Sequence, residues 1–289
     1  MPSSSPFDVT AANDTGDYVL PFQFENLPIR GRLISLELTA STITGYHPYP
    51  PAVASLLGQT LAVTAGLASL LSFEGAFTVQ TSGDGFVPMM VCDATPQGGL
   101  RGYAQMRAGQ MAFGQTLPEL IGTGYLAFTA EQARERYQGI VSLEGKTLAE
   151  CIEQYFRQSE QIQTYVRLAA GALGRFGWKA NGLLLQQMPN IAPPSDIAVD
   201  NQETAAEGWR RLGMILQTLG EEELLAVDTD NTLLLRRLFA EDTVRIFPAR
   251  PVHPYCRCSV ERIEQVLTAL PENDLRELAE DGETSLTCE

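Results

Sequence analysis

The chain has 289 residues, 44% of them hydrophobic, which is enough to bury a sizeable core and to form two domains or one domain with appendages. Its formal net charge of −15 argues against nucleic acid or an anionic membrane surface as a partner, because their phosphates would be repelled. Its five cysteines are too few, and odd in number, to predict a disulfide scaffold.

The N-terminal stretch favours a cytoplasmic protein. The first 15 residues contain no Lys or Arg and no apolar run, so they do not predict a secretory signal or a mitochondrial presequence. Residues 1–16 are rich in Ser, Asp and Asn, and we expect them to lack a fixed structure. In a reducing cytoplasm, a cluster of thiols is typical of a metal site or a redox switch.

Two strands, at Tyr18–Phe24 and Arg32–Leu38, are predicted to precede a long uncharged stretch. From Leu38 to Phe73 there is no Asp, Glu, Lys or Arg, and residues 52–71 are long enough to span a membrane. The Ser, Thr, Gln and Gly residues within 52–71 favour a helix buried inside the protein. A transmembrane helix is the alternative.

The next block is rich in predicted strands. Strands are expected at 76–81, 87–92 and 100–104, with the turn Ser82-Gly-Asp-Gly85 joining the first two into a hairpin. Gly83-x-Gly85 is too short for a dinucleotide-binding fingerprint. Cys92 is expected to lie on one face of its strand as a small apolar residue.

A helix at 148–156 and two more strands complete this region. Cys151 shares one helix face with Leu148, Ile152 and Tyr155, so it is expected to be a core residue rather than a catalytic one. Ser159-Glu-Gln161 ends the helix, and strands are predicted at 165–170 and 182–188.

The clearest domain boundary is Asn190-Ile-Ala-Pro-Pro-Ser-Asp196. Short amphipathic helices with apolar residues at 209–219, 224–225 and 233–239 follow it, and then a strand at 243–247. The pattern predicts an α+β protein with three parts. These are a β-rich core domain with packed helices at 1–192, a helical linker region at 193–248 and a small C-terminal zinc and redox module at 249–289.

The chemistry of the C-terminal module is carried by cysteines. Cys256 and Cys258 are separated by one residue, which is too close for a relaxed disulfide but suits two ligands on one metal. Together with Cys288 they offer three thiolates to a tetrahedral zinc ion. His253 is a candidate fourth ligand, the alternatives being a solvated His253 and a chain without metal. Unrelated free cysteines in a loop are the alternative interpretation of this spacing.

The residues between these cysteines predict a unit that is too small to fold alone. A helix is expected at 260–270 with Ser259 as its N-cap and Pro271 after its end. A second short helix at 275–279 and a strand at 284–287 would return the chain to Cys288. A module of about 40 residues with so little apolar surface usually needs a metal or a covalent link.

No catalytic constellation is predicted. The chain has two histidines, His47 and His253, and neither a serine elbow nor an HExxH pattern. A Ser-His-Asp arrangement around His47 has no support from spacing.

Along nearly its whole length the chain resembles the heat-shock protein 33 family, the redox-regulated holdase chaperones of bacteria. The segments that carry the resemblance are His47-Pro-Tyr-Pro50, Leu100-Arg-Gly-Tyr-Ala104, Tyr155-Phe-Arg-Gln-Ser-Glu-Gln161, Leu185-Gln-Gln-Met-Pro189 and Tyr255-Cys-Arg-Cys-Ser259 with Glu261-Arg262. The family pattern is Cys-x-Cys followed after roughly 30 residues by Cys-x-x-Cys, and the spacing to Cys288 agrees with it.

The resemblance implies a function and a switch. In such proteins four cysteines hold zinc in the reduced, inactive state, and oxidants form two disulfides and release the metal. The zinc module and linker then unfold, and the active form, often a homodimer, holds unfolding proteins without ATP and passes them to the DnaK-type refolding system. For this chain, the resemblance implies that Cys256, Cys258 and Cys288 are zinc ligands and redox thiols, and that its partners are unfolded proteins.

This sequence departs from the family at its end. The fourth cysteine would follow two residues after Glu289, where the sequence stops, so we expect weak zinc binding and partial activity without oxidant, or dimerisation that hides the apolar surface.

Two other functions remain open. A thiol-disulfide oxidoreductase could use Cys256 and Cys258, although the usual CxxC pattern after a strand is missing. A zinc-stabilised interaction module without a switch is the second. The chaperone hypothesis predicts a protein that is not an enzyme.

Overall fold

The computed structural model describes residues 16–108, 116–132, 135–174, 176–188, 198–226, 231–256, 258–271 and 275. The chain forms two compact units, Met1–Pro254 and Tyr255–Glu289. The predicted boundary segment Asn190–Asp196, the predicted strand Thr284–Thr287 and Cys288 lie outside the described residues. The division into parts at 1–192, 193–248 and 249–289 stays a prediction.

Among its described residues, the first unit contains two β-sheets of six strands each. In the first sheet, sheet A, the strands lie in the order β10 (Val244–Ile246), β1 (Tyr18–Phe24), β2 (Ile29–Leu36), β9 (Gly177–Gln187) and β8 (Thr164–Gly174), with β11 (Arg250–Pro251) also paired to β1. All of these pairings are antiparallel. β1 is apolar along nearly its whole length because both faces of this sheet are covered.

The second sheet, sheet B, is also antiparallel except at one edge. Its strands lie in the order β12 (His253–Pro254), β5 (Gly99–Gln105), β4 (Met89–Ala94), β3 (Phe77–Gly83), β6 (Gly124–Gln132) and β7 (Glu135–Ser142). β12 pairs with β5 in the parallel direction. The C-terminal end of the first unit therefore adds strands to both sheets.

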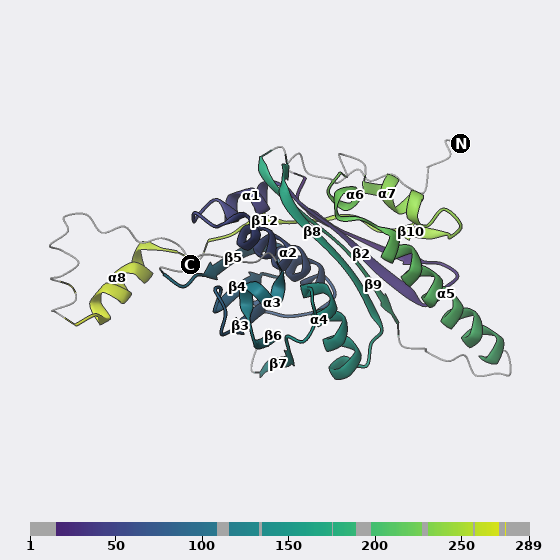
Figure 1. The fold of residues 1–289 in the computed structure, drawn as a ribbon, viewed down its shortest axis with the longest axis horizontal. Helices are drawn as coiled ribbons and strands as arrows, with labels where there is room; N and C mark the ends of the chain where they lie inside the picture. The colour runs from purple at the N-terminus through teal and green to yellow at the C-terminus, as the bar shows by residue number, and fades with distance from the viewer. Residues whose placement is uncertain are drawn as a thin grey trace. The chain divides into compact units, whose positions relative to one another are not determined.

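The helix α2 (Pro51–Ala68) lies between the two sheets (Figure 1). Gly58 and Gly66 let it approach sheet A, because a Cβ at Gly58 would lie 2.8 Å from Ala170 Cβ and one at Gly66 would lie 2.9 Å from Ile34 Cδ1. On its opposite side it packs against β5 of sheet B, where Leu61 and Leu57 surround Gly102. Because both sides are buried, α2 carries no charged residue.

This arrangement confirms the prediction of a buried helix. Within the described part of the chain, α2 is the helix that is long and apolar enough to cross a membrane, and 72% of it is buried inside the fold. Burial between two sheets is typical of a core helix.

Three helices cover the other face of sheet A. They are α5 (Ala198–Thr218), α6 (Glu221–Leu225) and α7 (Asn231–Leu238). Their apolar residues form a second core with the outer face of the sheet, in which the ring of Phe239 lies 5.0 Å from that of Phe24. Tyr165 of β8 stacks on Trp209 of α5 with the ring centres 4.4 Å apart. Figure 1 shows these helices together on the side of sheet A that faces away from α2.

Most predicted elements are present, and the first departure lies at Arg32–Leu38. The strand β2 ends at Leu36, and the helix α1 (Leu38–Thr44) begins where the strand was expected to continue. The carboxylate of Asp17 accepts hydrogen bonds from the backbone N–H groups of Glu37 and Thr39, at 2.6 and 2.9 Å. These bonds satisfy backbone donors at the start of a helix, so they redirect the chain.

Several elements were not predicted from the sequence. They are the strands β6, β7, β11 and β12, the helix α3 (Leu117–Ile121) and the π-helix η1 (Phe156–Glu160), which extends α4 (Leu148–Tyr155). η1 ends at Gln161, which has a positive φ of 56°. The prediction that Ser159-Glu-Gln161 ends this helix is confirmed.

Candidate metal and redox site

The segment that leads to the cysteines is fixed by the first unit. Val252 donates its backbone N–H to Asp17 O at 3.1 Å, and His253 donates its backbone N–H to Gly98 O at 3.0 Å. These bonds hold the segment against the N-terminal end of β1 and the β4–β5 turn. Only the backbone of His253 takes part in these contacts, and its side chain is exposed.

The second unit begins with the Cys-x-Cys pair. Cys256 and Cys258 are both exposed. The backbone N–H of Cys258 donates to Cys256 Sγ with a donor–acceptor distance of 3.3 Å. A hydrogen bond to sulfur stabilises the thiolate, which is the form that binds metals and reacts with oxidants.

The helix α8 (Val260–Ala269) follows directly after this pair. The carbonyl of Ser259 accepts the N–H of Ile263 at 3.0 Å, which confirms Ser259 as the N-cap residue. Hydrogen bonds from the backbone N–H of Glu261 and from the Ser259 side chain lower the pKa of Glu261. Where the structure describes its side chains, α8 buries none of them, and Val260 is 67% exposed.

Cys92 and Cys151 have the opposite environment. Both are fully buried, Cys92 on β4 facing α2 and Cys151 on α4. Burial, with the nearby charge of Asp93, raises the pKa of the Cys92 thiol well above its usual value. Burial also raises the pKa of Cys151, and the negative charge of nearby Glu150 raises it further. The prediction that these two cysteines are structural core residues agrees with their positions.

The described residues bring together two of the predicted ligands. Cys256 and Cys258 are adjacent, whereas Cys288 lies outside the described range. No group of three or more His, Cys, Asp and Glu side chains suited to a metal occurs among the residues that the structure describes. Two exposed cysteines, with the backbone N–H of Cys258 donating to Cys256 Sγ, are chemically suited to zinc, which prefers thiolate ligands. His253 and Cys288 as further ligands remain predictions.

Comparison with known proteins identifies the family. The sequence matches the family described as "Hsp33 protein" over residues 17–289. It is 39% identical over 293 aligned residues to the "33 kDa chaperonin" of Caulobacter vibrioides strain NA1000, covering 96% of this chain and 94% of that protein. The chain belongs to the Hsp33 family. It is also 38% identical to the "33 kDa chaperonin" of Pseudomonas paraeruginosa strain PA7, over 92% of this chain and 86% of that protein.

The fold agrees with this assignment. The crystal structure of a 33 kDa chaperonin from Thermotoga maritima superposes with a TM-score of 0.76 and 17% sequence identity, covering 93% of this chain and 91% of that one. The likeness shows the same mixed α+β fold with two sheets and packed helices. Hsp33 proteins are chaperones and not enzymes, which excludes the oxidoreductase alternative for Cys256 and Cys258.

Proposed function

We propose that this family member is a redox-regulated holdase that binds unfolding proteins without ATP in the cytoplasm under oxidative stress. The observation that carries the proposal is the contrast between its cysteines. The exposed Cys256 and Cys258 adjoin each other at the start of the second unit, while Cys92 and Cys151 are sealed in the core. Oxidants therefore reach the first pair alone among the described cysteines.

In the reduced state, Cys256, Cys258 and Cys288 would hold zinc, with His253 as a candidate fourth ligand. A bound zinc ion would keep these thiols deprotonated and close together while protecting them from random pairing. The chain would supply the Cys258 N–H, which bonds Cys256 Sγ and orients it. Without the zinc ion, α8 would have little to hold it in place, because none of its described side chains is buried.

Activation would be oxidation of these thiols. A disulfide forms as two of these thiolates lose two electrons, and a peroxide oxidant takes up the two electrons and two protons from the solvent to give two molecules of water. Because disulfide sulfur is a poor metal ligand, the module would lose its cross-link and unfold. This converts a covalent change into loss of structure in the second unit.

The apolar surface that binds clients would lie beneath α5–α7. Leu212 and Leu216 of α5 pack on the outer face of sheet A together with Phe22. Among the polar contacts that attach these helices to the sheet are the bonds from Arg167 Nε to Leu216 O at 2.9 Å and from Asn181 Nδ2 to Leu224 O at 2.7 Å. Displacing the helices would expose a broad apolar sheet face, which is what unfolded proteins bind.

The active form would be a homodimer that passes its clients to a DnaK-type refolding system. A holdase needs no ATP because binding an exposed apolar segment is favourable in itself. Release to a refolding system completes the cycle, since the holdase has no means of refolding its clients.

The test is suppression of light scattering by a heat-unfolding client enzyme, with the chaperone reduced or treated with peroxide. Oxidised protein should suppress aggregation without ATP, and reduced protein should suppress it less. Cys256→Ser should abolish the dependence on oxidant, because the variant can neither complete the metal site nor form its disulfide. Cys151→Ala, a change at a buried cysteine outside the pair, should keep the dependence.

The outcomes separate the two parts of the proposal. If the wild-type protein fails to suppress aggregation in either redox state, it is not a holdase. If Cys256→Ser responds to oxidant as the wild type does, the chaperone function stands and the switch is located elsewhere.

A further inference from the structure

Three arginines gather at the C-terminal end of α2. Arg30 and Arg32 alternate along β2 and lie on the face of sheet A that α2 covers, since the intervening Gly31 faces the ring of Phe22 on the opposite side. Arg250 of β11 reaches the same place. Arg32 Nε donates to Ser69 Oγ at 2.9 Å, and Arg250 Nη1 donates to Ser69 O at 3.0 Å.

No salt bridge within the described part of the chain balances this cluster, although Glu160 lines a second cavity together with Arg30. None of the three guanidinium groups forms an ion pair there. Arg30 bonds the amide oxygen of Gln186 through Nη2 at 3.0 Å, and its Nε is buried without a hydrogen-bond partner. Burial, followed by the like charges of Arg30 and Arg250, lowers the pKa of Arg32 to about 10.

Such a cluster is unexpected in this protein. The chain has 35 acidic residues against 20 Lys and Arg, so an arginine has many possible carboxylate partners. The C-terminus of α2 attracts cations, but a helix end carries only about half a negative charge. The half negative charge at the end of α2 can balance part of one guanidinium group. The positive charge of the other two arginines is then left without a balancing negative charge.

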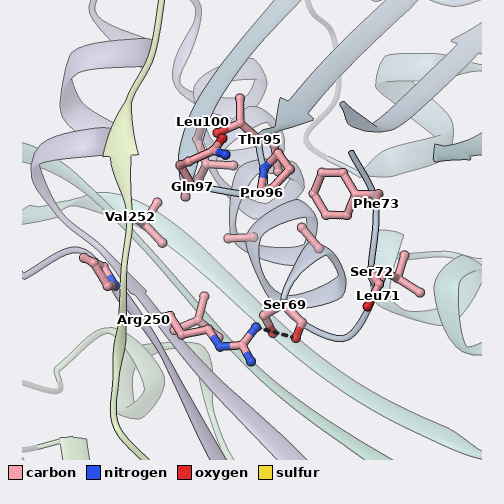
Figure 2. A pocket seen from close by; sticks show the side chains of 16 residues that line it. Ser69, Leu71, Ser72, Phe73, Thr95, Pro96, Gln97, Leu100, Arg250 and Val252 are labelled. Carbon is pink, nitrogen blue, oxygen red and sulfur yellow. Dashed lines mark hydrogen bonds between the residues drawn. The ribbon is translucent and has the colours of Figure 1, made fainter. Parts of the chain in front are cut away.

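A pocket lies beside this charge. It has a volume of about 500 Å³ and lies entirely within the first unit. Its walls are the end of α2 with Ser69 and residues 71–73 after it, the β4–β5 turn at 95–98, and the segment 250–252. Figure 2 shows Arg250 and Ser69 on one side of it, Pro96 and Gln97 across from them, and the ring of Phe73 at another wall.

We propose that this pocket binds a small phosphorylated molecule. Its phosphate would bind Arg250 directly, with Arg32 and Arg30 behind adding positive charge, and its organic part would pack on Phe73, Pro96 and Leu100. The pocket volume lies in the range of small-molecule sites, roughly 300–1,000 Å³. Arginine binds phosphate through two parallel N–H···O bonds.

The charge selects phosphate over carboxylate. A phosphate monoester is close to a dianion at neutral pH, whereas a carboxylate carries a single charge, so phosphate balances the cluster better. The net charge of −15 on the whole chain opposes long polyanions such as RNA and favours a compact ligand that fits inside the pocket.

Occupancy would have a local consequence. The pocket wall at Arg250–Val252 immediately precedes the hydrogen bonds of Val252 N–H to Asp17 O and of His253 N–H to Gly98 O. A phosphate bound to Arg250 would hold this segment against the core, so the two amides should exchange with deuterium more slowly when the site is filled.

The test is isothermal titration of the full chain with phenyl phosphate, inorganic phosphate and benzoate at constant ionic strength. Phenyl phosphate should bind saturably at one site per chain and more tightly than inorganic phosphate, and benzoate should bind more weakly than both. Arg250→Gln should weaken phenyl phosphate binding by about tenfold or more, because charge-assisted hydrogen bonds are lost. Arg250→Lys should weaken it less, since it retains the charge but not the paired donors.

Arg107→Gln is the matched control. Arg107 also donates to a backbone carbonyl, from Nε to Gly85 O at 2.8 Å, and its removal changes the net charge equally. Arg107 lies outside the pocket lining, so Arg107→Gln should bind phenyl phosphate with the same affinity as the wild type. Exchange at residues 252–253 should slow with phenyl phosphate in the wild type and in Arg107→Gln, but not in Arg250→Gln.

Several results would overturn the proposal. Absence of saturable phenyl phosphate binding, or equal weakening in Arg107→Gln and Arg250→Gln, would refute the site. If benzoate binds as tightly as phenyl phosphate, the pocket is not selective for phosphate. If phenyl phosphate and inorganic phosphate bind with equal affinity, the organic part of the ligand does not pack on Phe73, Pro96 and Leu100. Circular dichroism of each variant separates these results from loss of folding.

Discussion

In the first unit, α2 lies between two sheets and 72% of it is buried, whereas the described side chains of α8 in the second unit are all at least partly exposed. The cysteines follow the same division. Cys92 and Cys151 are buried in the core of the first unit, and Cys256 and Cys258 are exposed at the start of the second. One region is stabilised by apolar burial, and the described part of the other shows no comparable burial.

This difference has a physical consequence. A helix of ten residues such as α8 is too short to be stable in water without tertiary contacts, since isolated helices shorter than about 12–15 residues are marginal. The second unit therefore needs another source of stability, and the cysteine pair can provide one through a metal. The first unit needs none. The following experiments perturb one region and ask whether the other responds.

The largest effect is expected from removing the metal proposed for the second unit. A structural zinc site contributes on the order of 10 kcal/mol to the folding of a small module. Chelation of the reduced protein should therefore abolish protection from hydrogen exchange in α8, while amides of α2 and β9 keep theirs. The measurement is exchange followed by peptide mass spectrometry. Unchanged protection in α8 after complete removal of zinc would show that the second unit is stabilised in some other way.

The next effect is on thiol reactivity. Cys92 and Cys151 can react only when the core opens, which suppresses labelling by more than about a thousandfold when opening costs over about 4 kcal/mol. Their raised pKa values add to this protection, because little thiolate forms near neutral pH. In metal-free reduced protein, an alkylating reagent should modify Cys256 and Cys258 completely before it modifies Cys92 or Cys151.

Mass spectrometry of the peptides at several times gives the rates, and protein unfolded in urea is the control in which all thiols should react. Rapid modification of Cys151 in folded protein would contradict the division between core and exposed cysteines.

The two regions also differ in how far the sequence predicted them. The strand Tyr18–Phe24 was predicted with the bounds that the structure has, because a continuous apolar run is flanked by Asp17 and Glu25. The buried helix at 52–71 followed from its lack of charge together with its Ser, Thr, Gln and Gly residues. The spacing of Cys-x-Cys predicted two ligands for one metal, and the structure adds that both cysteines are exposed. These features depend on local sequence.

The features that were missed depend on residues far apart in the chain. The start of α1 relies on the carboxylate of Asp17, which no local pattern around Leu38 reveals. β7 is an edge strand whose residues are mostly exposed, so it lacks the apolar alternation that marks a strand. The arginine cluster joins Arg30 and Arg32 of β2 to Arg250 of β11, and only the fold brings them to Ser69. Cys288, also predicted as a ligand, stays a prediction.

Within the first unit, a buried ion pair should be more sensitive than any surface charge. Lys179 Nζ lies 3.3 Å from Glu37 Oε1, and both side chains are buried. Lys179→Met leaves the carboxylate of Glu37 without this partner in the core and should destabilise the unit by about 3–5 kcal/mol. Lys146→Met, at an exposed position, should change stability by less than about 0.5 kcal/mol. Urea denaturation followed by circular dichroism measures both, and equal midpoints would show that the pair adds nothing.

The last test compares α2 and α8 through the loss of stability when one side chain of each helix is shortened to Ala. Leu61 of α2 is fully buried between the sheets, so Leu61→Ala should cost about 2–5 kcal/mol through lost contacts and the cavity left behind. Val260 of α8 is 67% exposed, and Val260→Ala removes little buried surface while slightly favouring the helix, so stability should change by less than about 0.5 kcal/mol. Urea unfolding reports the first change, and hydrogen exchange in α8 reports the second. A cost above about 1 kcal/mol for Val260→Ala would mean that α8 packs against apolar partners when the module is complete, and that burial stabilises the second unit as it does the first.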